Sequence, residues 1–561
     1  MARSFNRIDR VRPIGDWSGN NRFYHEASNQ YFEMTEREGK YFQRRYQLDR
    51  SGSESNNFEK EIDFILGSGN KERDYFYLSS SGELVQFPVV WYSENAKWGM
   101  APGYDRPDHE GFSRRVEYRC FFCHNGYPEL PEGWARYEAQ RPRFPEELPA
   151  GIGCERCHGP GGLHVDQASR GAGLSEIRAG IVNPARLDRK LQLDVCMQCH
   201  LETSSSLLPD VVLKDGRDIF SYRPGEPLEE HAAIFDYPVD SGHDEFNIVH
   251  QAYRLRKSLC FASSEMTCTT CHDPHSVPAD KPTFYKQKCL DCHPSVDDCA
   301  ESVQARAANG DDCLACHMPQ RRTHDVVAAT MTDHYIQRRV PEDLLAERTE
   351  PTEPYTGPLR FYLPDDEEDL YLGLALARGA DVSAGVEQLA ALTQPDDFAS
   401  ITPLYYLASG YQSLGRTSEA IREYRRVLDL DSDYTEARYN LGIAMIEQGT
   451  MVAAITELEE VLRQDPGFAD AHIALARAKG DRLRRPMSRV DQILLIETVR
   501  QHNLAALESD PFHLVALNNL GLLEIEFDRP DEATAYFERA LAIDPTNATA
   551  NTNLDRLRRQ N

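Results

Sequence analysis

One short motif, Cys-x-x-Cys-His, occurs six times in this chain and constrains its fold more than any other feature. Two thiols separated by two residues can each form a thioether at one edge of a porphyrin, and the histidine that follows can ligate the iron. The motif therefore predicts six covalently attached c-type hemes. The predicted attachment residues are Cys120, Cys123, Cys154, Cys157, Cys196, Cys199, Cys268, Cys271, Cys289, Cys292, Cys313 and Cys316, and the predicted iron ligands beside them are His124, His158, His200, His272, His293 and His317.

Zinc binding is the main alternative for paired cysteines. A structural zinc site needs two such pairs and does not require a histidine directly after the second cysteine. Here the histidine follows in all six copies, which favours heme. Two cysteines, Cys260 and Cys299, lie outside the motifs. An oxidising compartment would favour a disulfide between them, and two buried free thiols are the alternative.

The distribution of residue types divides the chain into four parts. Aromatic and β-branched runs around turns such as Glu38-Gly39 and 80–82 predict a small β-rich region over 1–115. Residues 116–340 hold all the cysteines and show no sustained periodicity, so we expect a loop-rich multiheme cytochrome c domain in which porphyrin faces replace an aliphatic core. Its clearest helix is predicted to run from Asn183, as the N-cap, to Cys196. Residues 341–366 carry five prolines among acidic residues and predict a semi-rigid linker.

From residue 367 to 561 the composition becomes helical and rich in alanine and leucine. Gly415 and Ala420 recur as Gly449 and Ala454, each shifted by 34 positions, and later units follow after an insertion of roughly eleven residues near 480–490. This pattern resembles the tetratricopeptide repeat over about 401–547. It predicts an all-α solenoid that offers a large surface to protein partners.

Charge and hydropathy limit the partners. The formal charge is −28, with 90 acidic and 62 basic residues, so nucleic acid and anionic membranes would be repelled at long range. No window of about 18 apolar residues exists, and no transmembrane segment is expected.

Each heme iron has a second axial position that another side chain can fill. Nine histidines up to residue 340 lie outside the motifs: His25, His109, His164, His231, His243, His250, His275, His324 and His334. Six of them would make every heme bis-histidine and closed to substrate. His164 and His275 lie too close to their own motifs to reach the opposite face of that heme, but each could reach the iron of a packed neighbour.

Stretches beyond the motif carry a family resemblance. Residues 157–161 and 271–275 resemble the cytochrome c-554-like and doubled-motif multiheme cytochromes. Residues 65–70, 91–93, 102–105, 123–128, 222–227 and 331–334 are similar to a bacterial family that joins such a cytochrome to tetratricopeptide repeats. The resemblance implies the distal iron ligands His25, His109, His164, His243, His275 and His334, with His231, His250 and His324 behind them. It also implies an upstream export signal and a seventh motif, since residues 1–4 look like the middle of a family segment.

These features favour an electron carrier over an enzyme: bis-histidine hemes transfer electrons while the repeats dock redox protein partners. One alternative is self-association into a homopolymer, an extracellular conductive filament. The other is an oxidoreductase for a small nitrogen or sulfur compound, which would need a heme with an open distal side. Because hemes of this type are attached after export, we expect a periplasmic or extracellular protein.

Overall fold

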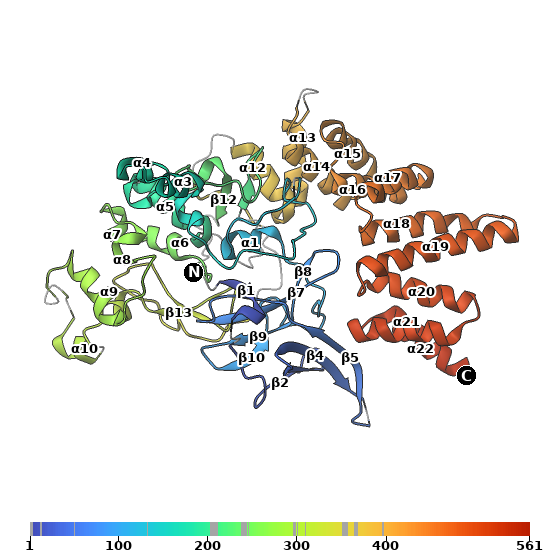
Figure 1. Cartoon of the computed structure of the whole chain (residues 1–561), viewed down its shortest axis with the longest axis horizontal. Helices are drawn as coiled ribbons and strands as arrows, with labels where there is room; N and C mark the ends of the chain where they lie inside the picture. Colours follow the sequence, from blue (N-terminus) through green and yellow to red (C-terminus); the bar gives the residue numbers. More distant parts are fainter. Residues whose placement is uncertain are drawn as a thin grey trace.

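The computed structural model describes residues 4–560 except 12–13, 50, 132, 202–210, 237–243, 245, 296–298, 300, 309, 350–356, 364–367 and 395–397. His243 and much of the predicted linker therefore lie outside the described residues. Figure 1 shows a β-rich part, a middle part of short helices and loops, and a curved stack of helices ending at the C-terminus.

The N-terminal region is β-rich, as predicted, and its strands form two antiparallel sheets. One sheet has the order β1-β6-β7-β9-β10, with β8 paired to β7, and the other has the order β2-β3-β4-β5. The strands are β1 (Phe5–Arg7), β2 (Arg22–His25), β3 (Gln30–Arg37), β4 (Lys40–Leu48), β5 (Glu54–Glu61), β6 (Phe64–Leu66), β7 (Glu72–Leu78), β8 (Leu84–Gln86), β9 (Val89–Tyr92) and β10 (Lys97–Met100).

Turn chemistry and alternation explain the second sheet. Arg37 pairs with Lys40, and Glu38 and Gly39 between them have φ of +55° and +77°. Positive φ at both central positions matches the twist of a two-residue hairpin, which confirms the predicted turn. Along β3, Phe32 and Met34 point into the core, while the alternating residues Tyr31, Glu33 and Thr35 are partly exposed.

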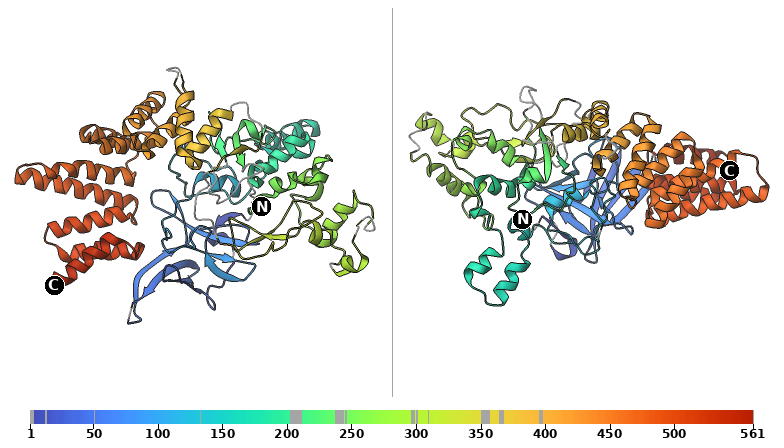
Figure 2. Two further views of the ribbon diagram at one scale, coloured as in Figure 1. Left: turned by 180° about the vertical axis from the view of Figure 1, so that it is seen from behind. Right: turned by 90° about the horizontal axis from the view of Figure 1, so that it is seen from above.

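The middle part consists of short elements. Its helices are α1 (Tyr118–His124), α2 (Glu155–His158), α3 (Gly162–Ser169), α4 (Leu174–Ala179), α5 (Arg189–His200), α6 (Gln251–Arg256), α7 (Leu259–Ala262), α8 (Cys268–Cys271), α9 (Lys281–Leu290), α10 (Val303–Ala308) and α11 (Cys313–His317). Its strands are β11 (Val211–Leu213), β12 (Ala232–Asp236), β13 (Gln320–Arg322), β14 (Thr330–Thr332) and β15 (Arg360–Phe361). Figure 2 shows the hairpin of α3 and α4 projecting from the body.

The predicted helix from Asn183 to Cys196 is wrong at its start. Asn183 caps only a short 3₁₀ turn, Pro184–Arg186, and α5 begins later with Asp188 as its N-cap. The Asp188 carboxylate accepts a hydrogen bond from the Leu191 backbone N–H at 2.9 Å. Two capping signals stand five residues apart, and the second one starts the helix.

Side chains supply little core to much of this part. Among the described residues between Phe261 and Val326, no hydrophobic side chain is buried. The same holds between Leu148 and Leu193. These stretches nevertheless form defined helices, as expected if another apolar body fills the space between them.

The C-terminal part is an all-helical array, as predicted. Its helices are α12 (Glu368–Ala375), α13 (Val382–Leu392), α14 (Ile401–Ser413), α15 (Thr417–Leu430), α16 (Thr435–Gln448), α17 (Met451–Gln464), α18 (Ala469–Gly480), α19 (Arg489–Ser509), α20 (Leu514–Glu526), α21 (Pro530–Ile543) and α22 (Ala548–Gln560). Paired helices cross closely at small residues: a Cβ added to Gly442 would meet Leu458 at 2.8 Å, and one added to Gly521 would meet Phe537 at 2.6 Å.

The repeats pack directly on the β-rich region. One apolar cluster contains Phe58 of the sheets and Leu517 and Phe537 of the repeats. The ring of Phe512, in the loop before α20, meets that of Phe58 edge to face with centroids 5.0 Å apart. The views of Figures 1 and 2 place the helical stack along one side of the sheets.

Candidate heme-attachment sites

The six motifs adopt the local conformation that their spacing predicts. Each begins or ends a short helix, in α1, α2, α5, α8, α9 or α11. In the second and fourth motifs the backbone N–H of His158 and of His272 donates to the carbonyl of the first cysteine, each at 3.0 Å. Residues three apart lie on one face of a helical turn, so the two thiols of a motif emerge together. Local sequence is enough to produce this arrangement.

Two motif histidines face a second imidazole that comes from a distant part of the chain. The rings of His158 and His275 have centroids 5.9 Å apart and planes 17° apart. Those of His272 and His334 have centroids 6.0 Å apart and planes 30° apart. An imidazole nitrogen lies about 2 Å from the metal it ligates, so ring centres on opposite sides of one iron should be about 6 Å apart. Both pairs fit a shared iron.

The orientation of several rings also suits ligation. Nδ1 lies 2.8 Å from a backbone carbonyl oxygen in His158 (Val182), His164 (Ile177) and His317 (Gln337), and 3.0 Å from one in His334 (Thr332). A proton on Nδ1 can donate to that carbonyl, which leaves the lone pair of Nε2 for a metal. The four carbonyl contacts therefore leave Nε2 of each ring as the nitrogen available to a metal.

A buried ion pair anchors the chain at His334. The Arg254 guanidinium donates twice to the carboxylate of Asp333, at 2.9 and 2.7 Å, and both side chains are at most 1 % exposed. Arg321 lies 3.5 Å from the same carboxylate. The Asp333 carboxylate also accepts the Tyr335 backbone N–H at 2.9 Å. Burial lowers the pKa of His334 to about 4, so its ring is neutral at pH 7, as a ligand must be.

Neighbouring motifs bring their thiols together. The thiol of Cys196 forms a hydrogen bond with that of Cys268 in the next motif. This hydrogen bond, together with burial, raises the pKa of Cys196. Burial raises the pKa of Cys289 to about 12, and the Cys313 thiol of the sixth motif adds to the effect. The third motif thus lies beside the fourth, and the fifth beside the sixth.

Other predicted ligands have different surroundings. His25 is buried in the sheets with Nδ1 2.7 Å from Ser28 Oγ and Nε2 3.0 Å from Asp105. His109 lies beside it, with ring centroids 5.6 Å apart. His200 has Nδ1 2.8 Å from the side-chain oxygen of Gln251. The ligand roles of these residues, like those of all the other candidate histidines, stay predictions.

One lower-ranked histidine lies near the first motif. His231 stacks on Phe122, with centroids 6.2 Å apart and planes 15° apart. Both rings line a cavity of about 30 Å³. Burial lowers the pKa of His231 to about 4. Sequence reasoning also missed Arg254 and the role of Asp333, although a charged residue directly before a candidate ligand was a visible signal.

Cys260 and Cys299 are both free thiols, so the structure favours the second of the two possibilities for this pair. Burial raises the pKa of Cys260, with a contribution from Cys292 of the fifth motif. Cys299 instead contributes to the raised pKa of Cys316 in the sixth motif. The two cysteines therefore neighbour different motifs rather than each other.

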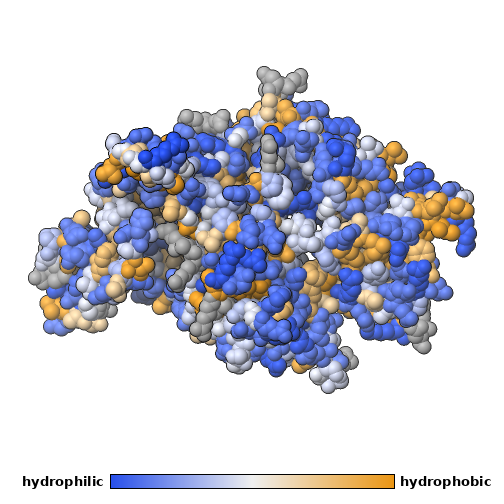
Figure 3. All heavy atoms as spheres, viewed as in Figure 1, coloured by the Kyte–Doolittle hydropathy of each residue, from blue (hydrophilic) through white to orange (hydrophobic). Residues whose placement is uncertain are grey.

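Among the described residues, no three histidine, cysteine, aspartate or glutamate side chains converge as a metal site. None of the helices in the described ranges has the length and apolarity needed to cross a membrane. Figure 3 shows a face on which hydrophilic residues predominate, in keeping with the net charge.

Comparison with known proteins supports the repeats directly and the cytochrome more distantly. Tetratricopeptide-repeat family models match residues 412–479 and 502–548. A "Multiheme cytochrome MtrA" of Shewanella baltica is 26% identical over 182 residues, 31% of this chain and 44% of that protein. "DnaJ homolog subfamily C member 3" of Rattus norvegicus is 26% identical over 124 residues, 22% of this chain and 24% of that protein. The chain thus spans less than half the length of either relative.

Solved structures of repeat proteins align with about a third of the chain. The tetratricopeptide protein YrrB, described as having an unusual peptide-binding site, aligns at 15% identity and a TM-score of 0.28, over 34% of this chain and 92% of that one. MamA aligns at 21% identity and a TM-score of 0.28, over 33% of this chain and 99% of that one. On the family models the chain contains tetratricopeptide repeats, and its similarity to a multiheme cytochrome is confined to one stretch at 26% identity.

Proposed function

We propose that this chain is an exported six-heme c-type cytochrome that transfers electrons, with tetratricopeptide repeats that contact protein partners. The observation that carries the proposal is the pairing of motif histidines with distant imidazoles, His158 with His275 and His272 with His334, at about the separation that a shared iron requires. Zinc would not call for facing pairs of this kind.

The cysteines of each motif would hold one heme by two thioethers, and the motif histidine would ligate its iron. His275 would complete the second site and His334 the fourth. His164 has its Nδ1 held by the Ile177 carbonyl, so it is prepared to ligate a further iron. Bound heme supplies a one-electron couple at the iron.

Several groups would tune that couple. The Val182 and Gln337 carbonyls make the rings of His158 and His317 better electron donors by accepting hydrogen bonds from Nδ1–H. The scarcity of buried hydrophobic side chains around the second, fourth, fifth and sixth motifs is a second support, because porphyrin faces would supply the missing apolar core. The adjacency of the third and fourth motifs, and of the fifth and sixth, favours transfer between neighbouring hemes.

The test is heme stoichiometry in the exported chain. With heme-attachment machinery present, intact mass should exceed that of the polypeptide by six hemes. The double variant Cys268→Ala, Cys271→Ala should carry five. The matched control Cys260→Ala should still carry six, because Cys260 lies outside the motifs. A wild-type mass without heme would refute the proposal.

Partner contact is tested separately, by mapping which surfaces of the intact protein become protected from hydrogen exchange when a redox partner is added. If the repeats contact the partner, backbone amides of the repeats should become protected from exchange.

A further inference from the structure

The second helix of each of four successive repeats ends at an aspartate. Asp431, Asp465, Asp510 and Asp544 follow α15, α17, α19 and α21 directly. Their spacings are 34, 45 and 34 residues, which is the repeat length plus the eleven-residue insertion in one unit. The loops that join one repeat to the next therefore form an edge of the solenoid, which we call the loop edge.

One carboxylate oxygen of each aspartate stabilises its own loop. In each loop Oδ1 accepts a hydrogen bond from the backbone N–H of the residue two positions later. In the order of the aspartates, the donors are Asp433 at 3.0 Å, Gly467 at 3.1 Å, Phe512 at 3.0 Å and Thr546 at 2.8 Å. Aspartate commonly forms such turns. This local role explains the residue type but leaves Oδ2 available.

In three of the four repeats Oδ2 contacts the N-terminal half of the chain. Asp431 accepts the Tyr137 hydroxyl at 2.6 Å and pairs with Arg136 at 3.0 Å. Asp465 pairs with Arg143, and Asp510 pairs with Arg115 at 3.4 Å. At the fourth repeat the buried Arg45 donates to the Ile543 carbonyl at 2.7 Å, beside Asp544.

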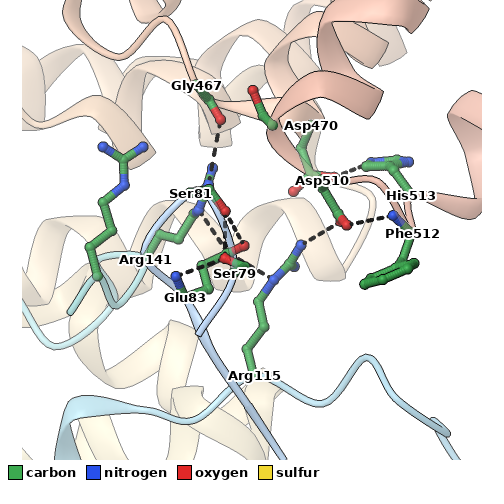
Figure 4. A network of polar contacts seen from close by, with 12 residues as sticks. Ser79, Ser81, Glu83, Arg115, Arg141, Gly467, Asp470, Asp510, Phe512 and His513 are labelled. Carbon is green, nitrogen blue, oxygen red and sulfur yellow. Dashed lines mark hydrogen bonds and ion pairs between the residues drawn. The ribbon is translucent and has the colours of Figure 1, made fainter. Parts of the chain in front are cut away.

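A second layer of polar contacts joins the same surfaces (Figure 4). The buried carboxylate of Glu83 lies between Arg115, at 2.8 Å, and Arg141, at 2.9 Å. The Arg141 backbone N–H donates to Glu436 of α16 at 2.8 Å, and its side chain reaches the Gly467 carbonyl at 3.5 Å. The ring of Tyr137 stacks on that of Tyr434, with centroids 4.2 Å apart.

We propose that the loop edge is the docking surface for the N-terminal half of this same chain, which it recognises through arginines presented at the spacing of the repeats. Residues 134–144, which connect the first motif to the second, are held on this edge. The repeats thereby set the position of the segment between two motifs, and an external partner of the repeats uses another face. This inference goes beyond the proposed electron transfer and does not depend on heme.

Amide hydrogen exchange in the full-length protein tests the proposal. The triple variant Asp431→Asn, Asp465→Asn, Asp510→Asn keeps an Oδ1 acceptor for each turn but removes the charge that meets the arginines. Exchange across 134–144 should accelerate about tenfold or more, while the amides of α15, α16 and α17 keep their wild-type rates.

The matched control removes the same number of charges away from the loop edge, in Asp481→Asn, Asp528→Asn, Asp531→Asn, and should leave 134–144 unchanged. Wild-type exchange in the test variant would overturn the proposal. Equal acceleration of 134–144 and of the repeat helices would also overturn it, because the aspartates would then be turn residues only. The single variant Arg143→Gln provides a milder test should the triple variant fail to fold, with acceleration of 134–144 again required.

Discussion

Replacing Arg254 with Met should detach His334 from its site without removing a heme. The change keeps a long apolar stem but leaves the Asp333 carboxylate, which is fully buried, without its bidentate partner. Removing one member of a buried ion pair costs about 3–5 kcal/mol, since a charge is left uncompensated. Arg321, 3.5 Å from Asp333, can move toward it, so we expect the lower end, about 3 kcal/mol.

The loss should concentrate at the segment that Asp333 holds. Its carboxylate fixes the Tyr335 backbone N–H, and the Ser258 hydroxyl accepts the Ile336 N–H at 2.8 Å, so residues on either side of His334 are normally tied down. When the carboxylate turns away, the His334 ring should leave the ring of His272. In Arg254→Met one iron should become high-spin, as in His334→Ala.

The assay combines electron paramagnetic resonance of the oxidised protein with heme counting by intact mass. Six hemes with one high-spin iron in both variants is the expected result. Asp244→Asn is the control, since Asp244 also pairs with Arg254 but its side chain is 53% exposed, and it should keep a low-spin spectrum. A low-spin spectrum in Arg254→Met together with a high-spin signal in His334→Ala would refute the positioning argument. Absence of heme from all variants would instead refute the proposed function.

Three further predictions concern other sites. His275→Ala should produce one high-spin iron by removing the ring that faces His158, and electron paramagnetic resonance would show it. Burial lowers the pKa of His502 to about 4, below the 6.5 of an unfolded histidine, so the unfolded chain binds a proton more readily than the folded one. The repeats should therefore lose stability as pH falls from about 6.5 to 4. His502→Gln should flatten that dependence in thermal unfolding followed by circular dichroism. Gly442→Val should destabilise the repeats by about 1–3 kcal/mol, because even a Cβ would meet Leu458 at 2.8 Å, and urea unfolding would measure the loss.

Local spacing determined the parts of this protein that depend on near neighbours in the chain. The hairpin at Glu38-Gly39 follows from a turn that needs positive φ, and a Cys-x-x-Cys pair shares one helical turn because residues three apart lie on one face. The 34-residue repeat places Gly442 where two helices cross closely. Each of these features requires only a few successive dihedral angles, so the local sequence alone can determine it.

Tertiary packing decided which distant groups meet. His334 was a candidate from sequence, but that it faces His272, 62 positions earlier, depends on the Arg254–Asp333 pair that folds the segment back. Cys260 and Cys299 lie in one chain at a reasonable spacing for a disulfide, yet they neighbour different motifs.

The relation between the repeats and the rest of the chain was also decided by packing. Composition predicted a linker over 341–366 and a solenoid after it, but not what the solenoid packs on. The aspartates of the loop edge and the ring of Phe512 pack the repeats on the N-terminal half of the chain. A repeat pattern encodes contacts between adjacent units, because each unit buries its apolar face on the next. It does not encode what lies against the edge, which depends on arginines some 290 to 500 positions away in the chain.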